Sequence, residues 1–387
     1  MTANLILSLS QEQAAKPYKF KATNIGVFSF EEAQYHCLHY WKQSVDDFTS
    51  DEFIDWVKTT LNLNFISSKL KEIAKLHSFS ERLIRFLSLT DYLDYGDAEA
   101  LRTELNAWES RKEWEKLKER ADDLMNTDEP EKAFALYKKA LLFEDNAQLY
   151  NNAAIALMKQ GEYAEAAGYL RKAMYKEPEN VPVILHLAEA YIMAGAFDLA
   201  GKTLGAAESY GDSADIHFFR AEIQERAGNS AGAVPLYEKA IAMDPATHYI
   251  YRFADVLVNL RMYERAAAVM DLIDNKDRSF LKKQAELFVK NNNIPAAIKC
   301  MEKALLTNRS SVDLWTRLAA YYRQDYDLNH AHSAISAAIA IDPADARANL
   351  EYARIKKAQG RIKDYQLILN TVLTGLKNRY RENLSYE

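Results

Sequence analysis

Glycine and proline are scarce in this 387-residue chain, which contains 12 and 8 of them. Folds with many short strands and tight turns need more of both, because glycine supplies positive φ angles and proline pre-sets turn geometry. Their scarcity favours long helices joined by short connections. The apolar share of 49% and the charged share of 27% are ordinary for a folded, water-soluble chain.

Cysteine and long apolar runs are also lacking. The two cysteines, Cys37 and Cys300, form neither a disulfide framework nor a zinc signature, which suits a reducing compartment. No apolar run approaches the roughly 18–20 residues of a membrane span. The start MTANLILSLS has no basic residue before its short apolar run, so it lacks the first feature of a secretory signal. We expect a soluble, cytoplasmic protein with no membrane partner.

A surplus of positive charge is missing too, since the formal net charge is −6. General nucleic-acid binders need a basic surface to neutralise phosphates, so we expect no nucleic-acid partner. The acidity is unevenly distributed. Residues 1–110 contain 11 Lys and Arg against 16 Asp and Glu, whereas the remaining 277 residues contain 38 and 39.

Alanine recurs in this chain with a period of about 33 residues. The first series consists of Ala121, Ala154, Ala188, Ala221, Ala254, Ala285, Ala319 and Ala353. A second series follows twelve residues after each member and a third follows seven residues later, and most of their members are again alanine. Chance does not produce this in a chain of normal composition. The architecture must therefore be an internal repeat.

The pattern resembles the tetratricopeptide repeat, a helix–turn–helix unit of 34 residues. In that family, small residues at the eighth, twentieth and twenty-seventh places let two antiparallel helices approach closely. The second repeat, QLYNNAAIALMKQGEYAEAAGYLRKAMYKEPEN, matches best. Tyr150, Ala154 and Leu157 share one helix face. Gly161 ends the first helix, and Pro178 ends the second.

The resemblance covers about residues 111–380 and implies an all-α fold. We expect an α-solenoid of about eight helix pairs, a right-handed superhelix whose concave groove is lined mainly by the first helix of each pair. The pairs start near Trp114, Ala147, Val181, Ala214, Thr247, Arg278, Val312 and Ala346. Tyr365 and Val372 replace small residues in the eighth repeat, which fits a terminal cap. We divide the chain into residues 1–110 and a repeat superhelix with capping helices, residues 111–387.

Residues 1–110 lack the repeat but are predicted to be mostly helical. Ser29 followed by Glu32 indicates a capping box at the start of a helix. Further helices are expected in DEFIDWVKTTL, NFISSKLKEIAKL and SERLIRFLSLTDYL, and a short β-hairpin from NLILSLS and YKFKATNIGVFSF. The acidic stretch 91–104 is interpreted as a solvated helix face with a linker, or alternatively as a docking surface for a basic partner. The strings PYKF and VFSFEE resemble the N-terminal part of uncharacterised clostridial-type bacterial tetratricopeptide-repeat proteins, which implies no known activity.

The groove positions follow from the resemblance: the second, fifth, sixth, ninth, twelfth and thirteenth places of each repeat. The lining changes along the chain from amide and aliphatic through aromatic to basic, and exposed aromatics near arginine are common anchors of protein recognition. One of two adjacent phenylalanines must instead face the core. The candidate partner-binding residues are Asn151, Asn152, Ile155, His186, Glu189, Phe218, Phe219, Glu222, His248, Tyr251, Arg252, Lys282, Lys283 and Arg317.

Catalytic motifs are absent from the sequence. It has no glycine-rich phosphate loop, nucleophile elbow or HExxH string. His36 and His39 could share a helix face, but two ligands do not make a metal site, and packing among aromatic neighbours is the simpler interpretation. We expect no enzyme, no cofactor and no metal. A hydrolase or metalloprotein that uses these two histidines is the least favoured hypothesis.

Two functional hypotheses remain. The first is a non-catalytic scaffold or adaptor that binds an extended or helical segment of a partner protein in the groove. The second is a regulatory protein whose acidic N-terminal domain carries the specific activity, while the repeats recognise a partner or self-associate. A chaperone-type carboxylate clamp, known in some members of the family, is not expected. Its matching positions here include Asp122, which would repel a carboxylate, and Pro182 and His186 in place of cations.

Overall fold

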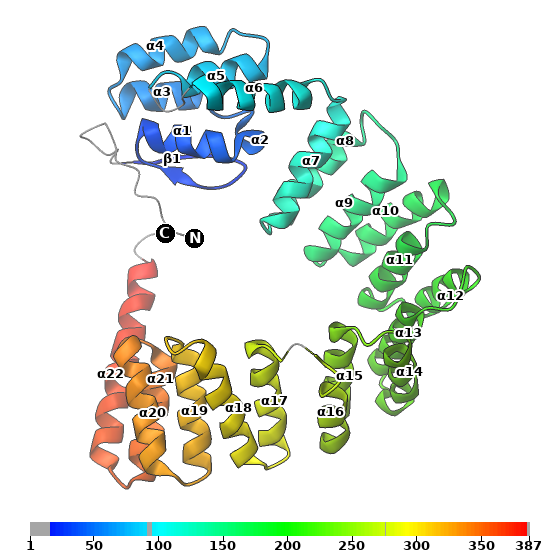
Figure 1. Cartoon of the computed structure of the whole chain (residues 1–387), viewed down its shortest axis with the longest axis vertical. Coiled ribbons are helices and arrows are strands. Elements are labelled where there is room, and N and C mark those ends of the chain that lie inside the picture. The colour runs from blue at the N-terminus through cyan, green and yellow to red at the C-terminus, as the bar shows by residue number, and fades with distance from the viewer. Residues whose placement is uncertain (1–15, 91–94, 275, 385–387) are drawn as a thin grey trace. The chain divides into compact units, whose positions relative to one another are not determined.

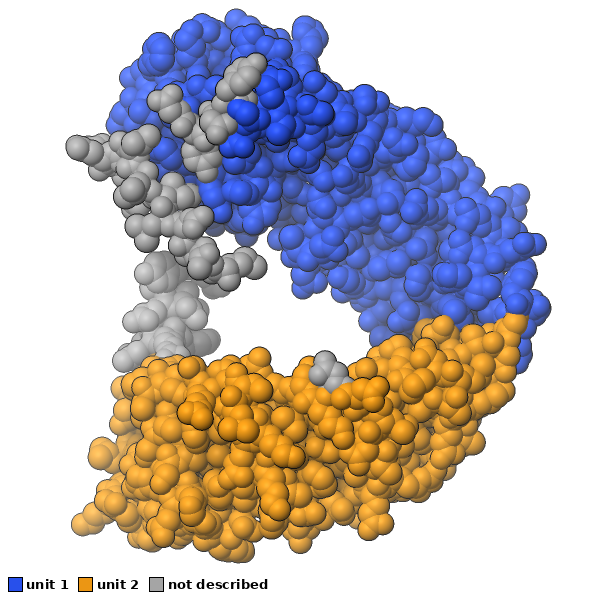
Figure 2. Space-filling model, viewed as in Figure 1, with its two compact units in different colours: residues 1–210 blue, residues 211–387 orange. Residues whose placement is uncertain are grey.

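The computed structural model describes residues 16–90, 95–274 and 276–384 of the chain. The chain divides into two compact units, residues 1–210 and residues 211–387 (Figure 2). The described residues form 22 helices and two short strands (Figure 1). None of the described helices combines the length and apolar composition that crossing a bilayer requires.

The N-terminal region, residues 16–109, contains the two strands and six helices. The strands β1 and β2 are Tyr18–Lys19 and Gly26–Val27, paired antiparallel. The helices α1 to α6 are Phe30–His39, Trp41–Ser44, Asp51–Thr59, Asn64–Ile73, Phe79–Leu87 and Tyr95–Glu109. The predicted N-cap of α1 is present, because Ser29 Oγ accepts from the Glu32 amide at 3.1 Å. The Glu32 carboxylate accepts from the Phe28 amide at 2.6 Å and not from that of Ser29, so the reciprocal bond of a capping box is not made to the N-cap residue.

The expected hairpin is only partly correct. Both described strands lie within YKFKATNIGVFSF, where Asn24 adopts a φ of +55° in the connecting turn. Asparagine tolerates this left-handed conformation better than most residues, so one stretch can fold back on itself. The stretch NLILSLS lies outside the described residues. The sequence predicts one helix over SFEEAQYHCLHYWKQ, but α1 ends at His39, before Tyr40, and a separate helix, α2, begins at Trp41.

Aromatic rings fill the core of the N-terminal region. Phe53 is fully buried, and its ring centroid lies 5.0 Å from that of Tyr18 and 5.7 Å from that of Trp56. Phe20 and Phe86, also fully buried, complete this cluster. Edge-on and tilted ring pairs at these separations are favourable beyond the area that they bury. Large side chains from α3, α5 and the hairpin therefore hold this region together.

Eight helix pairs follow. Their first helices are α7 Glu113–Asn126, α9 Ala147–Lys159, α11 Val181–Met193, α13 Ala214–Arg226, α15 Thr247–Asn259, α17 Arg278–Lys290, α19 Val312–Gln324 and α21 Ala346–Ala358. Their second helices are α8 Pro130–Ala140, α10 Tyr163–Lys176, α12 Phe197–Glu208, α14 Ser230–Met243, α16 Tyr263–Met270, α18 Ile294–Thr307, α20 Leu328–Ile341 and α22 Ile362–Leu384. The predicted starts are confirmed, seven at the residue named and the first one residue away.

The alanine series line the contacts within the helix pairs. All eight members of the first series are buried, seven of them completely, and Ala254 is 4% exposed. Alanine carries only a methyl group, so two helix backbones can approach closely without leaving a void. The eighth repeat departs from this rule as predicted. Tyr365 and Val372 are half-buried on α22, where Leu367 and Leu373 remain exposed.

The turn inside every repeat uses one residue with a positive φ. Glycine holds this place in four repeats, with φ between +76° and +86°. The other four use Asp128, Arg261, Asn292 and Tyr326, with φ between +57° and +62°. A left-handed residue ends a helix by redirecting the chain, and glycine adopts that conformation without a Cβ penalty. Arg261 and Tyr326 therefore hold an unfavourable backbone conformation that the flanking helices impose.

The N-terminal region contacts the first repeat within unit 1. Lys42 Nζ lies 2.6 Å from Glu119 Oε1, and Arg120 Nη2 lies 2.8 Å from Asp46 Oδ2. These ion pairs join the segment after α1 to helix α7. The first repeat, which has no preceding repeat, is thus covered by the N-terminal region.

Candidate partner-binding surface

The predicted groove residues lie on the first helices of six repeats in the two units. We call the residues at the second, fifth, sixth and ninth places of the first helices the first-helix surface. Unit 1 contains Asn151, Asn152, Ile155, His186 and Glu189, all half-buried. Unit 2 contains the other nine predicted residues, and their exposure ranges from buried Phe218 and Glu222 to exposed His248 and Lys283.

In unit 1 the first-helix surface is a chain of hydrogen bonds centred on Asp122. Its Oδ1 accepts from the Tyr137 hydroxyl at 2.6 Å and from Asn152 Nδ2 at 3.2 Å, while Lys118 Nζ donates to Oδ2 at 2.7 Å. Burial, aided by this hydrogen bond, raises the pKa of Tyr137 and keeps the hydroxyl a donor. The Asp122 carboxylate is therefore already satisfied by the protein. A partner's carboxylate would meet like charge there.

The second polar pair in unit 1 joins α9 to α11. His186 Nδ1 lies 2.8 Å from Asn151 Oδ1. The two predicted residues thus contact each other across neighbouring repeats. This contact fixes the relative position of their side chains on the first-helix surface.

The two adjacent phenylalanines of α13 divide between core and surface. Phe218 is 9% exposed and packs against Tyr249, with ring centroids 4.6 Å apart, and against Tyr237 at 5.6 Å. Phe219 is half-buried. Phe218 is therefore a core residue, which leaves Phe219 as the accessible ring. This placement follows from the 100° step between consecutive residues of a helix.

The aromatic middle of the surface also contains an ion-pair cluster in which Glu222 is buried and Arg252 and Glu225 are half-buried. Arg252 Nη2 lies 3.0 Å from Glu225 Oε2, and Arg252 Nε lies 3.3 Å from Glu222 Oε1 in an ion pair without hydrogen-bond alignment. Burial raises the pKa of the Glu222 carboxyl, although Arg252 opposes that effect. The cluster joins α13 to α15. Removing Arg252 alone would leave a poorly solvated carboxylate, which is strongly destabilising.

The expected basic end of the groove is neutralised by carboxylates of neighbouring first helices. Lys282 Nζ lies 2.7 Å from Asp313 Oδ2, and Lys283 Nζ lies 3.9 Å from Asp255 Oδ2. Arg317 Nη1 lies 2.5 Å from Glu286 Oε1. Because each pair connects consecutive repeats, these cations link the helices of unit 2. They are less available to an acidic ligand than the sequence alone indicates.

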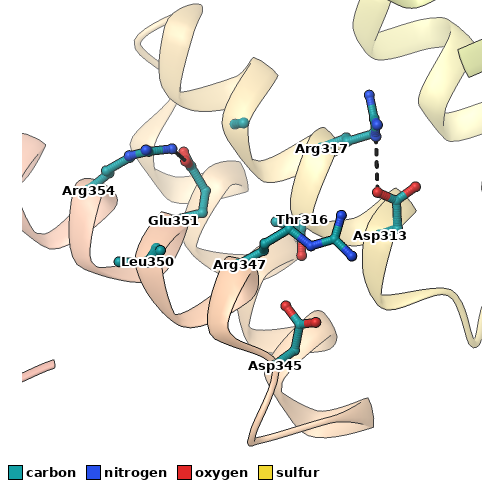
Figure 3. A pocket seen from close by; sticks show the side chains of 9 residues that line it. Asp313, Thr316, Arg317, Asp345, Arg347, Leu350, Glu351 and Arg354 are labelled. Carbon is teal, nitrogen blue, oxygen red and sulfur yellow. Dashed lines mark hydrogen bonds and ion pairs between the residues drawn. The ribbon is translucent and has the colours of Figure 1, made fainter. Parts of the chain in front are cut away.

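A pocket of about 300 Å³ lies on the first-helix surface between α19 and α21 (Figure 3). It is lined by Asp313, Thr316, Arg317, Ala320, Asp345, Arg347, Leu350, Glu351 and Arg354. With Asp345 set aside, these residues occupy the second, fifth, sixth and ninth places of the seventh and eighth repeats. In the last two repeats, the residues at the predicted groove places therefore line one pocket together.

The arginines of this pocket differ in their partners. Arg317 donates to Asp313 at 3.1 Å, and Arg354 donates to Glu351 at 3.0 Å (Figure 3). Arg347 extends from the start of α21 toward Thr316 and makes no hydrogen bond or ion pair with any residue that the structure describes. The buried Oγ1 atom of Thr316 likewise has no hydrogen-bond partner among those residues. The exposed Arg347 guanidinium therefore offers five unused donors to a ligand, whereas the Thr316 hydroxyl is buried.

Arg317 was predicted, whereas Arg347, Glu351 and Arg354 were not. The signal for them was present in the sequence. They hold the second, sixth and ninth places of the eighth repeat, which are groove places in every repeat. The predicted groove residues end with Arg317 in the seventh repeat. Treating the eighth repeat as a cap left these groove positions out.

The histidine pair of α1 is not arranged as a metal site. His36 is 2% exposed, its Nε2 lies 2.7 Å from Thr23 Oγ1, and its Nδ1 lies 3.2 Å from Ser44 Oγ. Its ring stacks on Phe20 with centroids 3.8 Å apart. Burial lowers the pKa of His36 to about 4. Both nitrogens are occupied by hydroxyl groups, and in the described part of the chain no three His, Cys, Asp or Glu side chains cluster as metal ligands would.

Three family models, each described as a tetratricopeptide repeat, match residues 118–182, 157–223 and 214–247. The chain contains tetratricopeptide repeats. These matches cover the first four repeats, and the structure continues the same helix pairs through α22. Tetratricopeptide-repeat proteins are in general protein-interaction scaffolds.

Solved tetratricopeptide structures are similar to this chain at low identity. The C-terminal part of a repeat protein from Cytophaga hutchinsonii is 18% identical, covers 58% of this chain and 98% of its own length, and gives a TM-score of 0.46. A tetratricopeptide repeat protein from Parabacteroides merdae is 15% identical, with coverages of 67% and 98% and a TM-score of 0.41. A comparison with curated proteins finds no match.

Proposed function

We propose that this chain is a non-catalytic scaffold that binds an acidic segment of a partner protein on the first-helix surface of α19 and α21. The observation that carries the proposal is the pocket in which Arg347, an exposed guanidinium with unused donors, lines the same wall as Arg317 and Arg354. Guanidinium groups recognise carboxylates through paired, charge-assisted hydrogen bonds.

The other arginines support the same assignment. Glu351 is buried and lies 2.5 Å from Arg323 Nε and 3.0 Å from Arg354 Nη1. Its charge is therefore compensated within the protein and does not cancel Arg347. A partner carboxylate in the pocket would lie near Arg347 and the remaining donors of Arg354. Leu350 and Ala320 provide apolar contact for the rest of the segment.

Site-specific photo-crosslinking tests the proposal in the native host. Benzoylphenylalanine replaces Ala320 in the pocket or, as the control, Ala340, which is exposed on α20. We expect a protein adduct from position 320 and a different pattern from position 340. The double variant Arg347→Glu, Arg354→Glu should reduce the adduct at least about tenfold, because it puts like charge against the acidic segment.

The matched control for charge is Lys363→Glu, an exposed substitution on α22 outside the pocket. It should leave the adduct unchanged. Equal adducts from positions 320 and 340, or an adduct that survives both arginine substitutions in folded protein, would contradict the proposal.

We also propose that residues 1–110 form a separate domain. The buried cluster that contains Phe20, Phe53 and Trp108 is separate from the cluster of the first repeat, which contains Leu117 and Ala121. This separation supports the second functional hypothesis, in which the N-terminal domain has its own activity. We place the protein in the cytoplasm, because Cys37 and Cys300 are both buried free thiols.

A further inference from the structure

An apolar pocket of about 470 Å³ lies in unit 2 between the second helices α18 and α20, with α19 behind it. Its size is within the roughly 300–1,000 Å³ of ligand-binding pockets. The lining is mostly apolar and includes Leu305, Leu306, Trp315, Leu318 and Ala337. It shares none of its lining residues with the α19–α21 pocket.

Small residues on α20 create this space. Counted from the repeat starts, the twenty-sixth place is lysine in four repeats, Lys139, Lys172, Lys239 and Lys303, and alanine in the third and seventh, Ala206 and Ala337. The fifth and eighth repeats have Leu272 and Thr371 there. In the second repeat, Lys172 Nζ lies 5.5 Å from the ring centroid of Tyr150, which holds the fourth place. In the seventh repeat the aromatic at the fourth place is Trp315, and no long side chain from place twenty-six reaches over it.

The aromatic walls of the pocket are held in place by hydrogen bonds. Trp315 Nε1 donates to the Arg309 carbonyl at 2.8 Å, and the Tyr322 hydroxyl donates to Glu302 Oε1 at 2.7 Å. The Tyr322 ring also stacks on His330, with centroids 5.2 Å apart. Fixed walls reduce the entropy lost when a ligand binds. Leu306, which lines the pocket, is 73% exposed and is therefore accessible to a ligand.

The charged side chains near the pocket indicate the sign of the charge that its ligand should have. Lys299, Lys303 and Arg309 are exposed, and their side chains have no hydrogen-bond or ion-pair partner among the described residues. The one acidic lining residue, Glu302, already accepts the Tyr322 hydroxyl. Helix α20 contributes no Asp, Glu, Lys or Arg to the lining, and its lining residues are His330, Ser333, Ala334 and Ala337. Arg309 lines the pocket, and Lys299 and Lys303 lie on α18, the helix that also supplies Glu302, Leu305 and Leu306 to the lining. The side chains on this side of the pocket that lack a described partner are therefore positively charged.

We propose that the α18–α20 pocket is a second docking site, which takes a bulky apolar side chain of a partner protein flanked by Asp or Glu. The apolar side chain enters between Trp315, Leu305 and Leu306. The flanking carboxylates meet Arg309 and the lysines of α18. This site binds a different feature from the arginine pocket and acts independently of it.

Fluorescence anisotropy with the full chain tests the site. The probes are fluorescein-labelled, amidated undecapeptides with central Phe, Leu or Ser, flanked on both sides by Glu, Ser or Lys. We expect Glu-flanked Phe or Leu peptides to bind at least about tenfold more tightly than the central-Ser peptide, because burial of one such side chain contributes about 1.5–3 kcal/mol. They should also bind more tightly than Lys-flanked peptides.

Two matched variants locate the binding. Ala337→Lys places in the pocket the residue that four other repeats carry there, so it should fold normally and weaken binding about tenfold, although it adds an attractive charge. Ala340→Lys makes the same change at an exposed position of the same helix and should have little effect. Arg309→Glu should shift the preference toward Lys-flanked peptides.

Several outcomes would overturn the proposal: no binding of any Phe or Leu peptide, equal binding of Glu- and Lys-flanked peptides, or equal affinities of Ala337→Lys and wild type. Loss of binding in Arg347→Glu, Arg354→Glu with no loss in Ala337→Lys would assign the peptides to the other pocket. A concentration-dependent dimer in sedimentation that Ala337→Lys dissociates would show a second copy as the occupant, against the proposal.

Discussion

The N-terminal region packs large aromatic rings against one another, whereas the repeats pack alanine between helices. Phe53 and Phe86 each contact several rings in the first case. Ala221 and Ala319 fill helix crossings with a single methyl group in the second. Removing a side chain should therefore damage the first region most, and enlarging one should damage the second. The comparison shows that two helical regions of one chain can have opposite sensitivities.

The largest expected effect is that of Phe53→Ala. Loss of a fully buried ring should destabilise the N-terminal region by about 3–5 kcal/mol, since a cavity remains among Tyr18, Phe20 and Trp56. Hydrogen exchange under increasing urea should show earlier opening of residues 18–108 and unchanged opening of α13 to α20. The control Phe65→Ala, at a 71% exposed position, should change stability by less than about 0.5 kcal/mol. Equal effects of the two substitutions would contradict the aromatic core.

The converse test enlarges a repeat alanine. Ala221→Leu should cost about 1–3 kcal/mol, because extra methylene groups must enter a closely packed helix crossing. Ala242→Leu, at an exposed position of α14, is the matched control and should be nearly neutral. Urea denaturation followed by circular dichroism measures both. If Ala221→Leu were tolerated as well as Ala242→Leu, the helices would not meet at that alanine.

The stability of the N-terminal region should also depend on pH in a way that the repeats do not share, because His36 is buried there. Its folded pKa of about 4 lies below its unfolded value near 6.5, so the unfolded chain takes up a proton first and stability falls as pH drops through 6.5. Between pH 6.5 and 5 the loss should be about 1–2 kcal/mol. Asp47, whose pKa is raised by burial, contributes with the opposite sign. The free energy of unfolding should therefore be measured against pH for the wild type and for His36→Gln, because the difference between the two slopes isolates the contribution of His36. Identical slopes would contradict a buried, neutral His36.

The smallest effect concerns the repeat turns. Tyr326 is 90% exposed and has a φ of +62°, so Tyr326→Gly should stabilise the chain by about 1 kcal/mol or less through relief of the left-handed conformation. Gly195→Ala, at the same place of the third repeat with a φ of +76°, should destabilise it by a similar amount. Thermal unfolding of the two variants compares them. The same sign for both changes would show that the turn does not impose this conformation.

The sequence allowed the repeats to be predicted almost residue by residue, because their packing needs a small residue at fixed places and alanine marks those places visibly. Gly161 and Pro178 marked the helix ends for the same reason. The N-terminal region has no period, so its helices could be located but not their packing. The hairpin within residues 18–27 packs Tyr18 against Phe53 and Trp56, and the residue after the break at Tyr40, Trp41, packs against Phe79 and Trp108. No local pattern records these contacts.

The sequence predicted where the residues of the binding surface lie, but not which of their charges are paired within the protein. Lys282, Lys283 and Arg317 stand at groove places as expected, yet their pairing with Asp313, Asp255 and Glu286 depends on which side chains of consecutive first helices face each other. Phe218 and Phe219 could not be told apart for a related reason. Small differences in helix rotation decide which of two adjacent rings enters the core.

Hydrogen exchange of the full chain with and without the partner recovered by crosslinking tests the central claim most directly. We predict slower exchange in α19 and α21, at residues 313–320 and 347–354, with the rest of the chain little changed apart from the α18–α20 pocket. Protection confined to residues 18–108, with none in α19 and α21, would contradict the claim that the first-helix surface of the last repeats binds the partner.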